Sequence, residues 1–530
     1  MKRIICIFLA ILIASMCVIN TVALDKTNAA TDLPTMYIGG QGADLPIADE
    51  NGKRTGEYLY PVKYNTDEIL ESVNLLHQPF AKGVATGDWN DWCDTFVEII
   101  TPLFESYSMD ENGNSQVPVY MYERNVGQNC KNEDGKISLN TFQFNYDWRA
   151  DPVESTKRLN NYIKKLLNRQ KFGDVNMVGR CIGGNVLLAY LADYNLSNIN
   201  SAVFYCEGFE GFEIIGKLFT GDISIDADAL SRFADDYLSD GEYRDDEIYG
   251  MITDLISVLN TMKTLGVFVS TFDEIYSKVY SNVLPRILRK SFGTMPSFWA
   301  LVGDEYYEDA KKFVFGDEAE TTYASLIEKI DNFHYNYLLK YKDIIKRATD
   351  SGVKVYNVVK YGMQIFPTGG DNYIQSDTIL ETLSASAGAN CCRSNTKFTD
   401  EYLATIDLKY ISPDKQIDAS TCLMPDHTWF IKNITHMYMS ESADEVIAYL
   451  LDGKSYLSAP ECEEYPQFLL YDKETELISP LTEENGDIDN HPNFFRRLIS
   501  FFKHLFSIIS DFFNEKIEEI KESRNKQPTE

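Results

Sequence analysis

The chain has 530 residues, 44% of them hydrophobic, which is enough for one large core or for two domains. Its 80 acidic residues against 49 basic ones give a formal net charge of −31, which argues against a nucleic-acid partner and against binding anionic lipid through basic patches. Two of the 10 cysteines lie in the N-terminal apolar stretch, and the other eight lack the spacing of zinc ligands, so the sequence predicts no metal site. Their number and spacing do not specify a disulfide framework.

The first residues have the pattern of a targeting segment. Met1 to Arg3 are positively charged, residues 4–19 are apolar, and small residues occur near Ala23. This pattern predicts a signal peptide over residues 1–24, and therefore a secreted or cell-surface protein. An uncleaved anchor is the alternative that the pattern leaves open.

A strand at Met36 to Ile38 is expected to enter the glycine-rich loop 39–44. In hydrolases that carry their nucleophile on a sharp turn, such a loop supplies one of the two oxyanion donors. The candidate donor is the backbone N–H of Gln41. An ordinary strand-to-loop turn without a catalytic role is the alternative.

The next predicted elements alternate between strand and helix. The sequence predicts a strand at 142–148, a helix at 151–168, a second strand at 175–178, and a second helix that includes residues 186–191. Asp151, Pro152 and Glu154 are a capping residue, a first-turn proline and a box glutamate, so the first helix is expected to begin there. Strand, helix and strand in this order favour a parallel, right-handed arrangement.

Between the second strand and the second helix lies Gly179-Arg180-Cys181-Ile182-Gly183. The glycines allow strand and helix backbones to meet closely, as in the turn called a nucleophile elbow. Cys181 is therefore the candidate nucleophile, and the backbone N–H of Ile182 is the second candidate oxyanion donor. A glycine-rich turn around a buried structural thiol would give the same pattern.

One helix ahead of this turn stands Tyr146-Asp147-Trp148-Arg149. With the elbow that follows, this motif makes the chain similar to the lecithin:cholesterol acyltransferase family of lipases and acyltransferases, over roughly residues 33 to 455. The chain departs from the family at Cys181, where the family has serine. Cysteine in this turn also resembles polyhydroxyalkanoate synthases and dienelactone hydrolases.

The resemblance implies an α/β hydrolase core with a mostly parallel sheet and a helical cap insertion, and the residue pattern of the C-terminal segment adds an amphipathic helix. The expected division is a signal peptide at 1–24, the first part of the core with the elbow at 25–208, and the cap at 209–347. The second part of the core, with acid and base, would follow at 348–481. A linker and the amphipathic helix would complete the chain at 482–530.

The resemblance also indicates the acid. A β-branched, alternating strand is expected at 353–359, followed by a polar loop. In this loop Asp377, within Ser376-Asp377-Thr378-Ile379, resembles the family's aspartate ahead of a threonine and an aliphatic residue. Asp371 is the second choice.

Six histidines limit the choice of base. His427 and His436 follow Asp377, in the order nucleophile, acid, base that α/β hydrolases use. The segment 434–439, with a helix expected at 442–451, resembles the family's histidine segment, so His436 is the predicted base. His427 remains the alternative.

The C-terminal segment has an apolar stripe from Phe494 to Phe513, in which large hydrophobic residues recur every three to four positions. Arg496, Arg497 and Lys503 add local positive charge. The pattern predicts an interfacial helix on a membrane or a partner-binding helix. Docking onto the protein's own domain is the alternative.

These observations predict a secreted acyltransferase or lipase-like ester hydrolase that acts on a lipid ester. A triad of Cys181, His436 and Asp377 would form a thioester acyl-enzyme, and no cofactor is needed. Water or an alcohol would resolve the thioester, and the sequence leaves this choice open. A polyester synthase or small-lactone hydrolase, and a non-catalytic surface protein of the same fold, are the other two hypotheses.

Overall fold

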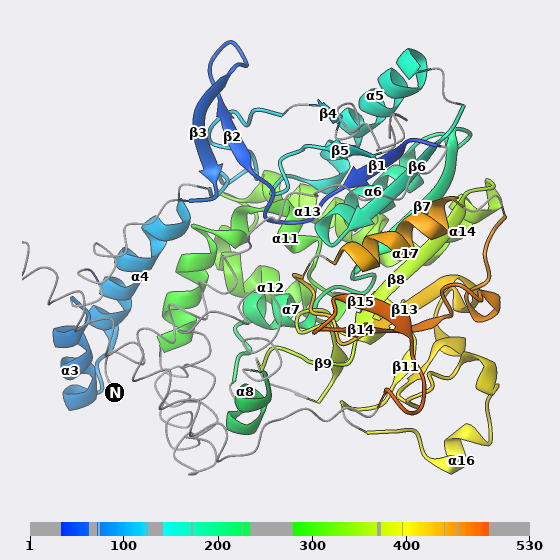
Figure 1. Ribbon diagram of the computed structural model, residues 1–530. Coiled ribbons are helices and arrows are strands. Elements are labelled where there is room, and N and C mark those ends of the chain that lie inside the picture. The colour runs from blue at the N-terminus through cyan, green and yellow to red at the C-terminus, as the bar shows by residue number, and fades with distance from the viewer. Residues whose placement is uncertain are drawn as a thin grey trace, which may run out of the picture.

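A nine-stranded sheet forms the centre of the computed structural model (Figure 1), with strand order β15-β14-β13-β8-β7-β6-β1-β5-β4. Seven consecutive strands from β14 to β5 are parallel, and β15 and β4 pair antiparallel at the two edges. The strands are β1 Thr35–Ile38, β4 Glu123–Asn125, β5 Thr141–Phe144, β6 Val175–Arg180, β7 Ile199–Tyr205, β8 Lys354–Tyr361, β13 Thr428–Lys432, β14 Phe468–Asp472 and β15 Leu477–Pro480.

The structure describes residues 33–62, 72, 75–105, 107–121, 123–125, 141–170, 173–224, 226–233, 279–367, 373–394, 396–438, 440–452 and 455–486. The predicted signal peptide, the residues 493–530 that carry the predicted amphipathic helix, and Asp371 lie outside these ranges. Within them, no helix combines the length and the apolar character that crossing a membrane requires.

The central strands are buried on both faces, as parallel strands between helical layers require. β6 and β7 run in register from Asn176↔Ser201 to Arg180↔Tyr205, and β1 lies on the other side of β6, with Ile38 opposite Gly179. Their carboxyl ends therefore meet at one edge of the sheet, where the loops that follow these strands come together.

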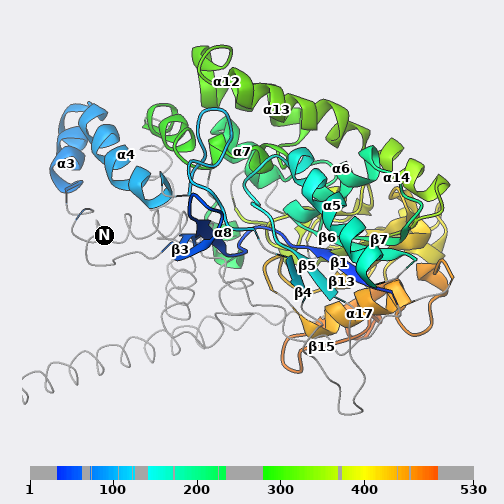
Figure 2. The ribbon, with the colours of Figure 1, turned by 90° about the horizontal axis from the view of Figure 1, so that it is seen from above.

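Helices cover both faces of the sheet. α5 Pro152–Gln170, α6 Ile182–Asp193 and α14 Tyr341–Asp350 pack together on one face, and α17 Glu441–Asp452 lies on the other (Figure 2). α6 has no polar stripe, because residues 182–191 are all buried between the sheet and α5 and α14. The side-chain Oδ1 of Asp151 accepts a hydrogen bond from Val153 N–H at 2.9 Å, as expected for a capping residue at the predicted start of α5.

The chain between β7 and β8 is helical where it is described. It contains α7 Glu213–Thr220, α8 Ala227–Phe233, a helix at 279–288, η2 Phe292–Thr294, α11 Pro296–Trp299, α12 Asp304–Phe315, η3 Gly316–Glu318, α13 Ala324–Asn336, η4 Leu338–Lys340 and α14. α7 packs against α12, whereas α14 packs against α6 and β8. The expected boundary at residue 347 thus falls inside a helix that covers the central sheet.

The remaining elements lie outside the central sheet and its flanking helices. They are β2 Leu45–Ala48, β3 Arg54–Tyr60, α3 His77–Thr86, α4 Asn90–Glu105, β9 Met363–Gln364, β10 Gln375–Ser376, α15 Thr382–Ala385, β11 Asn390–Cys391, α16 Asp400–Leu403, η5 Leu408–Tyr410, β12 Ile417–Asp418, η6 Ala419–Thr421, η7 Pro425–His427 and η8 Ala459–Glu461. In Figure 1, α3 and α4 stand to one side of the sheet.

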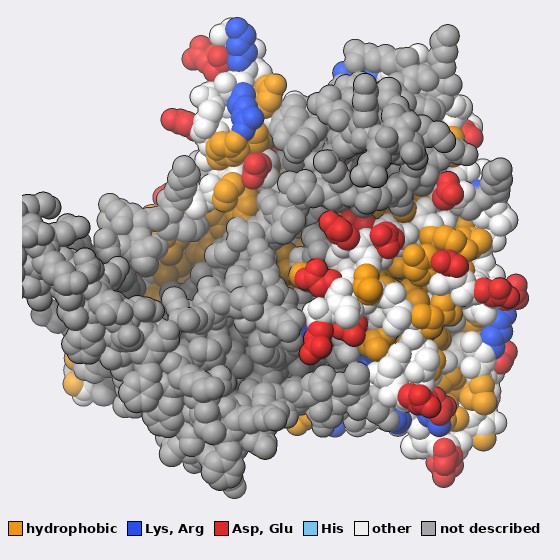
Figure 3. All heavy atoms as spheres, viewed as in Figure 1, with side chains coloured by type: hydrophobic (Ala, Val, Ile, Leu, Met, Phe, Trp, Pro, Cys, Tyr) orange, Lys and Arg blue, Asp and Glu red, His pale blue; other side chains and the backbone are white. Residues whose placement is uncertain are grey.

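The prediction of an α/β fold with a mostly parallel sheet and a helical insertion is confirmed. One strand is shorter than expected: the strand predicted at 142–148 ends at Phe144. The reason is that Tyr146, Trp148 and Arg149 bond to neighbouring loops rather than continuing the strand. On the described part of the face in Figure 3, acidic side chains outnumber basic ones, in keeping with the net charge.

Replacing Gly183 tests how closely α6 approaches β1. A Cβ at this position would overlap the carbonyl oxygen of Ile38 and lie 2.7 Å from that of Gly39. We therefore expect Gly183→Ala to lower the free energy of unfolding by about 1–3 kcal/mol, because both neighbours are backbone atoms. Gly173→Ala is the control, since no atom lies within 4 Å of its Cβ position. Equal urea denaturation curves for the two variants would contradict the close approach.

Candidate active site

Cys181 occupies the sharp turn between β6 and α6. Its backbone has φ 50° and ψ −130°, a positive φ that residues with a side chain rarely adopt. Two backbone hydrogen bonds fix the turn: Cys181 N–H donates to Tyr205 O at 3.1 Å, and Gly184 N–H donates to Cys181 O at 2.7 Å. The turn therefore holds the thiol at the carboxyl end of the sheet, and Cys181 is partly exposed.

His436 and Asp377 lie together at the same edge of the sheet. His436 Nδ1 and Asp377 Oδ2 are 2.7 Å apart, and both side chains are buried. Asp377 O also accepts a hydrogen bond from the backbone N–H of His436 at 2.7 Å. The other carboxylate oxygen accepts hydrogen bonds from Ile379 N–H and Leu380 N–H, at 3.2 and 2.8 Å. Four hydrogen bonds thus fix the imidazole relative to the carboxylate.

Cys181 and His436 affect each other's ionisation. Burial raises the pKa of the Cys181 thiol, but the charge and proximity of His436, the charge of Arg180 and the N–H of Ile182 together lower it below its ordinary value. Burial lowers the pKa of His436, but Asp377 and Cys181 raise it to about 9. The imidazole Nε2 has no hydrogen bond of ordinary geometry, and catalytic hydrogen bonds often tighten only with substrate. The two groups therefore favour a thiolate–imidazolium pair.

Two cations hold the segment that carries His436: Lys360 is buried and Arg180 is partly buried. Arg180 Nη2 donates to His436 O at 2.9 Å, and Lys360 Nζ donates to Thr435 O at 3.0 Å and to Tyr438 O at 2.9 Å. Burial lowers the pKa of Lys360 to about 8. Neither residue has a sequence pattern that predicts this role; the only signal is that Arg180 directly precedes Cys181.

The Tyr146–Arg149 motif supports the glycine-rich loop after β1. Tyr146 OH donates to Gly39 O at 2.8 Å, and Trp148 Nε1 donates to Ala43 O at 2.9 Å. Arg149 is fully buried, forms an ion pair with Asp147 at 2.7 Å, and donates to the Tyr107 carbonyl oxygen at 2.7 Å. The motif therefore fixes both ends of the loop that contains Gln41.

One candidate oxyanion donor, Ile182, follows Cys181 in the chain, and the other, Gln41, follows a glycine that packs on Cys181. Ile182 N–H faces the Cys181 sulfur closely enough to lower its pKa. Gly40, which precedes Gln41, packs on the elbow, because a Cβ there would lie 2.9 Å from Cys181 Cβ and 3.6 Å from its sulfur. The assignment of Gln41 and Ile182 to an oxyanion hole stays a prediction.

The second-choice histidine belongs to a different cluster. His427 Nδ1 bonds to Leu457 O at 2.8 Å, and its ring stacks on Tyr456 with ring centres 3.6 Å apart. Burial lowers the pKa of His427, so it is mostly neutral at pH 7. His436, and not His427, is therefore the histidine that lies beside Asp377.

Two further side chains at this centre were missed by the sequence analysis. Cys206 follows β7 directly, and its sulfur lies within 4.8 Å of ligand atoms of both His436 and Asp377. Among the described residues, Cys206, Asp377 and His436 form a group whose donor atoms are close enough to bind one metal ion. Because the His436–Asp377 hydrogen bond already joins two of the donors, the arrangement suits proton transfer. Glu207, the next residue, is fully buried without a hydrogen-bond partner.

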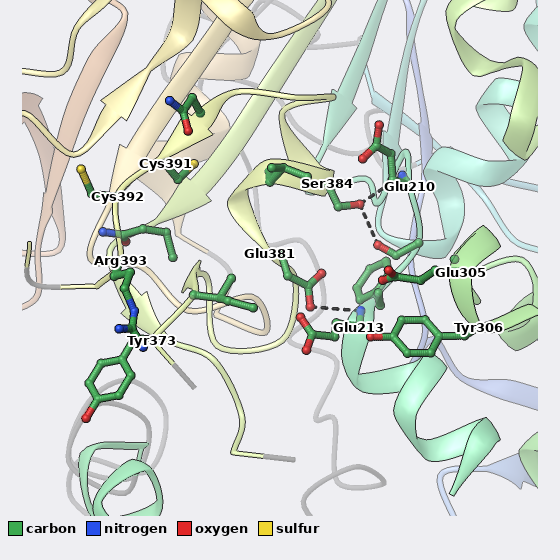
Figure 4. A pocket seen from close by; sticks show the side chains of 17 residues that line it. Glu210, Glu213, Glu305, Tyr306, Tyr373, Glu381, Ser384, Cys391, Cys392 and Arg393 are labelled. Atoms are coloured by element: carbon green, nitrogen blue, oxygen red, sulfur yellow. Dashed lines mark hydrogen bonds between the residues drawn. The ribbon is translucent and has the colours of Figure 1, made fainter. Parts of the chain in front are cut away.

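A cavity of about 310 Å³ adjoins this centre. Phe212 lines it and makes an edge-on contact with the His436 ring, with ring centres 5.8 Å apart. Figure 4 shows Glu213 and Glu381 next to one another on one wall and Arg393 on the opposite side. Burial raises the pKa of Glu381 to about 8. The cavity therefore offers a largely uncharged Glu381 close to the candidate base.

Comparisons with known proteins leave the family open. No family model matches the chain, and no curated protein matches it. Solved chains do match, among them one in the structure entitled "The crystal structure of Tle4-Tli4 complex". That chain is 9% identical, the match covers 62% of this chain and 74% of that one, and the TM-score is 0.26. At this TM-score the likeness carries no argument about function.

Replacing Lys360 tests whether its hydrogen bonds stabilise the segment that carries His436. We expect Lys360→Met to lower the free energy of unfolding by about 1–3 kcal/mol, because buried carbonyl groups lose a charged donor. Lys346→Met is the control, since Lys346 is exposed and pairs only with Asp350 at 2.6 Å; its expected effect is within about 0.5 kcal/mol. If chemical denaturation gives both variants the same stability, Lys360 does not support this segment.

Proposed function

We propose that the protein is an acyltransferase or lipase-like ester hydrolase in which Cys181 is the nucleophile, His436 the base and Asp377 the residue that orients the base. The observation that carries the proposal is the 2.7 Å His436–Asp377 hydrogen bond beside a thiol whose pKa is lowered. Residues from three separate loops meet there, which favours a built catalytic centre over a structural thiol.

The positions of these residues in the sheet support an α/β hydrolase architecture. Cys181 follows β6 in the middle of the sheet, Asp377 comes after β8, and His436 comes after β13. Nucleophile, acid and base thus occur in the chain order of α/β hydrolases, and the nucleophile stands between a parallel strand and the helix that follows it.

The reaction would proceed in two acyl-transfer steps. The Cys181 thiolate attacks the ester carbonyl carbon, and the carbonyl oxygen becomes an oxyanion that the N–H groups of Gln41 and Ile182 stabilise. Protonated His436 gives its proton to the leaving alkoxide, which departs as an alcohol and leaves a thioester. Neutral His436 then takes a proton from water or an acceptor alcohol. The deprotonated water or alcohol attacks the thioester carbonyl carbon, and the Cys181 thiolate leaves. Asp377 stabilises the imidazolium in both steps.

The lipid character of the ester and action outside the cell are further parts of this proposal. Their support is the apolar segment at residues 4–19 and the phenylalanine-rich stripe at 494–513. With a net charge of −31, contact with a lipid surface would depend on apolar area rather than on basic patches.

Acylation of Cys181 is the direct test. After brief incubation with a p-nitrophenyl ester and acid quenching, peptide mapping should find the acyl group on Cys181 and hydroxylamine should remove it. Cys181→Ala should lower kcat/KM by about a thousandfold or more, as expected for loss of a nucleophile. Cys462→Ala, which removes another partly exposed thiol, is the control. Unchanged turnover in Cys181→Ala would reject the proposal.

The pH dependence gives a second test. His436 has a raised pKa of about 9, so its proton is present below that pH and lost above it. We expect kcat/KM to fall as pH rises through about 9, since neutral His436 cannot protonate the leaving group. Asp377→Asn should move this fall to lower pH, because the Asp377 charge raises the His436 pKa. His427→Gln should leave it in place. An unshifted profile in Asp377→Asn would contradict the assigned acid.

A further inference from the structure

Cys181 and Cys206 stand side by side at the ends of two neighbouring strands. The last registered pair of β6 and β7 is Arg180↔Tyr205, and the two cysteines are the next residue of each strand. Both have the same unusual backbone, with φ 50° for Cys181 and φ 53° for Cys206. Adjacent strands lie about 4.8 Å apart, and Cα atoms joined by a disulfide are usually about 4.4–6.8 Å apart. The backbone spacing therefore suits a disulfide.

The two thiols also share one neighbour. Cys206 Sγ lies within 4.8 Å of a ring nitrogen of His436, and the Cys181 thiol is close enough to the same ring for each to shift the other's pKa. Cys181 is partly exposed, whereas Cys206 is 1% exposed. A small oxidant can therefore reach Cys181 more readily than Cys206.

We propose that Cys181 and Cys206 form a reversible disulfide when a hydroperoxide oxidises Cys181. Cys181 would be the oxidised residue and Cys206 the one that resolves the oxidised product. The inference rests on the proposed function only in so far as both need a reactive Cys181 thiolate; it does not depend on which ester the protein uses.

The chemistry balances with the groups that are present. The Cys181 thiolate attacks one peroxide oxygen and the O–O bond breaks. The departing alkoxide, or hydroxide when the probe is hydrogen peroxide, is protonated and leaves as an alcohol or as water. The sulfur becomes a sulfenic acid, and the peroxide is reduced by two electrons. Neutral His436 then takes the Cys206 proton, the new thiolate attacks the Cys181 sulfur, and the S–O bond breaks. The departing hydroxide takes the proton from His436 and leaves as water.

A buried partner thiol would protect Cys181 from irreversible damage. Burial raises the pKa of Cys206 to about 12, so it does not react with peroxide by itself. Lys360 and Arg180 lower that pKa in part and would stabilise the Cys206 thiolate when it forms. Disulfide formation would compete with further oxidation of the sulfenic acid to the sulfinic acid, which thiols do not reverse.

The test uses the full chain and hydrogen peroxide as the probe. After treatment, free thiols are blocked and peptides are mapped without reduction. The expected result is one cross-linked peptide pair that joins Cys181 to Cys206, is lighter than the two free peptides by two hydrogens, and is separated by dithiothreitol. In Cys206→Ser, Cys181 should instead yield a dimedone-trapped sulfenic acid and then a sulfinic acid that dithiothreitol does not restore. Cys206→Ala repeats the measurement with a side chain that cannot bond to His436.

Cys422→Ser is the matched control, because Cys422 is also buried but bonds to Thr428 away from His436; it should behave as the wild type. Equal sulfinic acid yields in wild type and Cys206→Ser, or a bond from Cys181 to another cysteine, would overturn the inference. The mapping needs no turnover. A Cys181–Cys206 bond in a protein that hydrolyses no ester would therefore reject the proposed function and support this inference. Ester hydrolysis by a protein that forms no Cys181–Cys206 bond would support the proposed function and reject this inference.

Discussion

Two cations under the His436 segment, buried Lys360 and partly buried Arg180, are the constraint on which the candidate active site depends. Arg180 and Lys360 donate to the carbonyl oxygens of residues 435–438, and their charged groups lie 5.8 and 5.1 Å from the centre of the Tyr205 ring. A loop that follows a strand has no repeating hydrogen bonds of its own, so its position must come from such contacts. Because Arg180 adjoins Cys181 in the chain, one residue fixes both the nucleophile's strand and the histidine's loop.

The same cations determine the local electrostatics. The chain as a whole is strongly acidic, with a formal charge of −31, yet the groups nearest Cys181 include Arg180 and a His436 with a raised pKa. Asp444, on α17, also lies in the field of Arg180 and Lys360, which lower its pKa, although burial raises it to about 6 overall. Most of the acidic residues that the structure describes are exposed and screened by solvent, whereas buried charges are screened much less. The interior therefore favours a thiolate despite the overall charge.

The sequence indicated the elements whose signal is local. The strand, turn and helix around Cys181 follow from a short apolar run, closely spaced glycines and a second apolar run, and Asp377 and His436 followed from motif resemblance and chain order. Arg180, Lys360, Cys206 and Glu207 were missed, because their roles come from contacts between segments far apart in the chain. A buried lysine in a β-branched strand such as β8 has no local pattern that separates it from a strand-edge lysine. The shortened β5 was missed for the same reason, since loops 39–44 and 107–115 bond the residues after Phe144.

The burial of Glu207 limits the negative charge near Cys181. Its two carboxyl oxygens have no hydrogen-bond partner, and Gly184 leaves the space that it fills, since a Cβ there would overlap the carboxyl group. An ionised carboxylate in such a place would be costly and would raise the pKa of the nearby Cys181 thiol. Burial instead raises the pKa of Glu207 well above its ordinary value, which favours the uncharged carboxyl group. The positive charge of Arg180 and His436 therefore acts on the Cys181 sulfur with little opposition from Glu207, which follows β7.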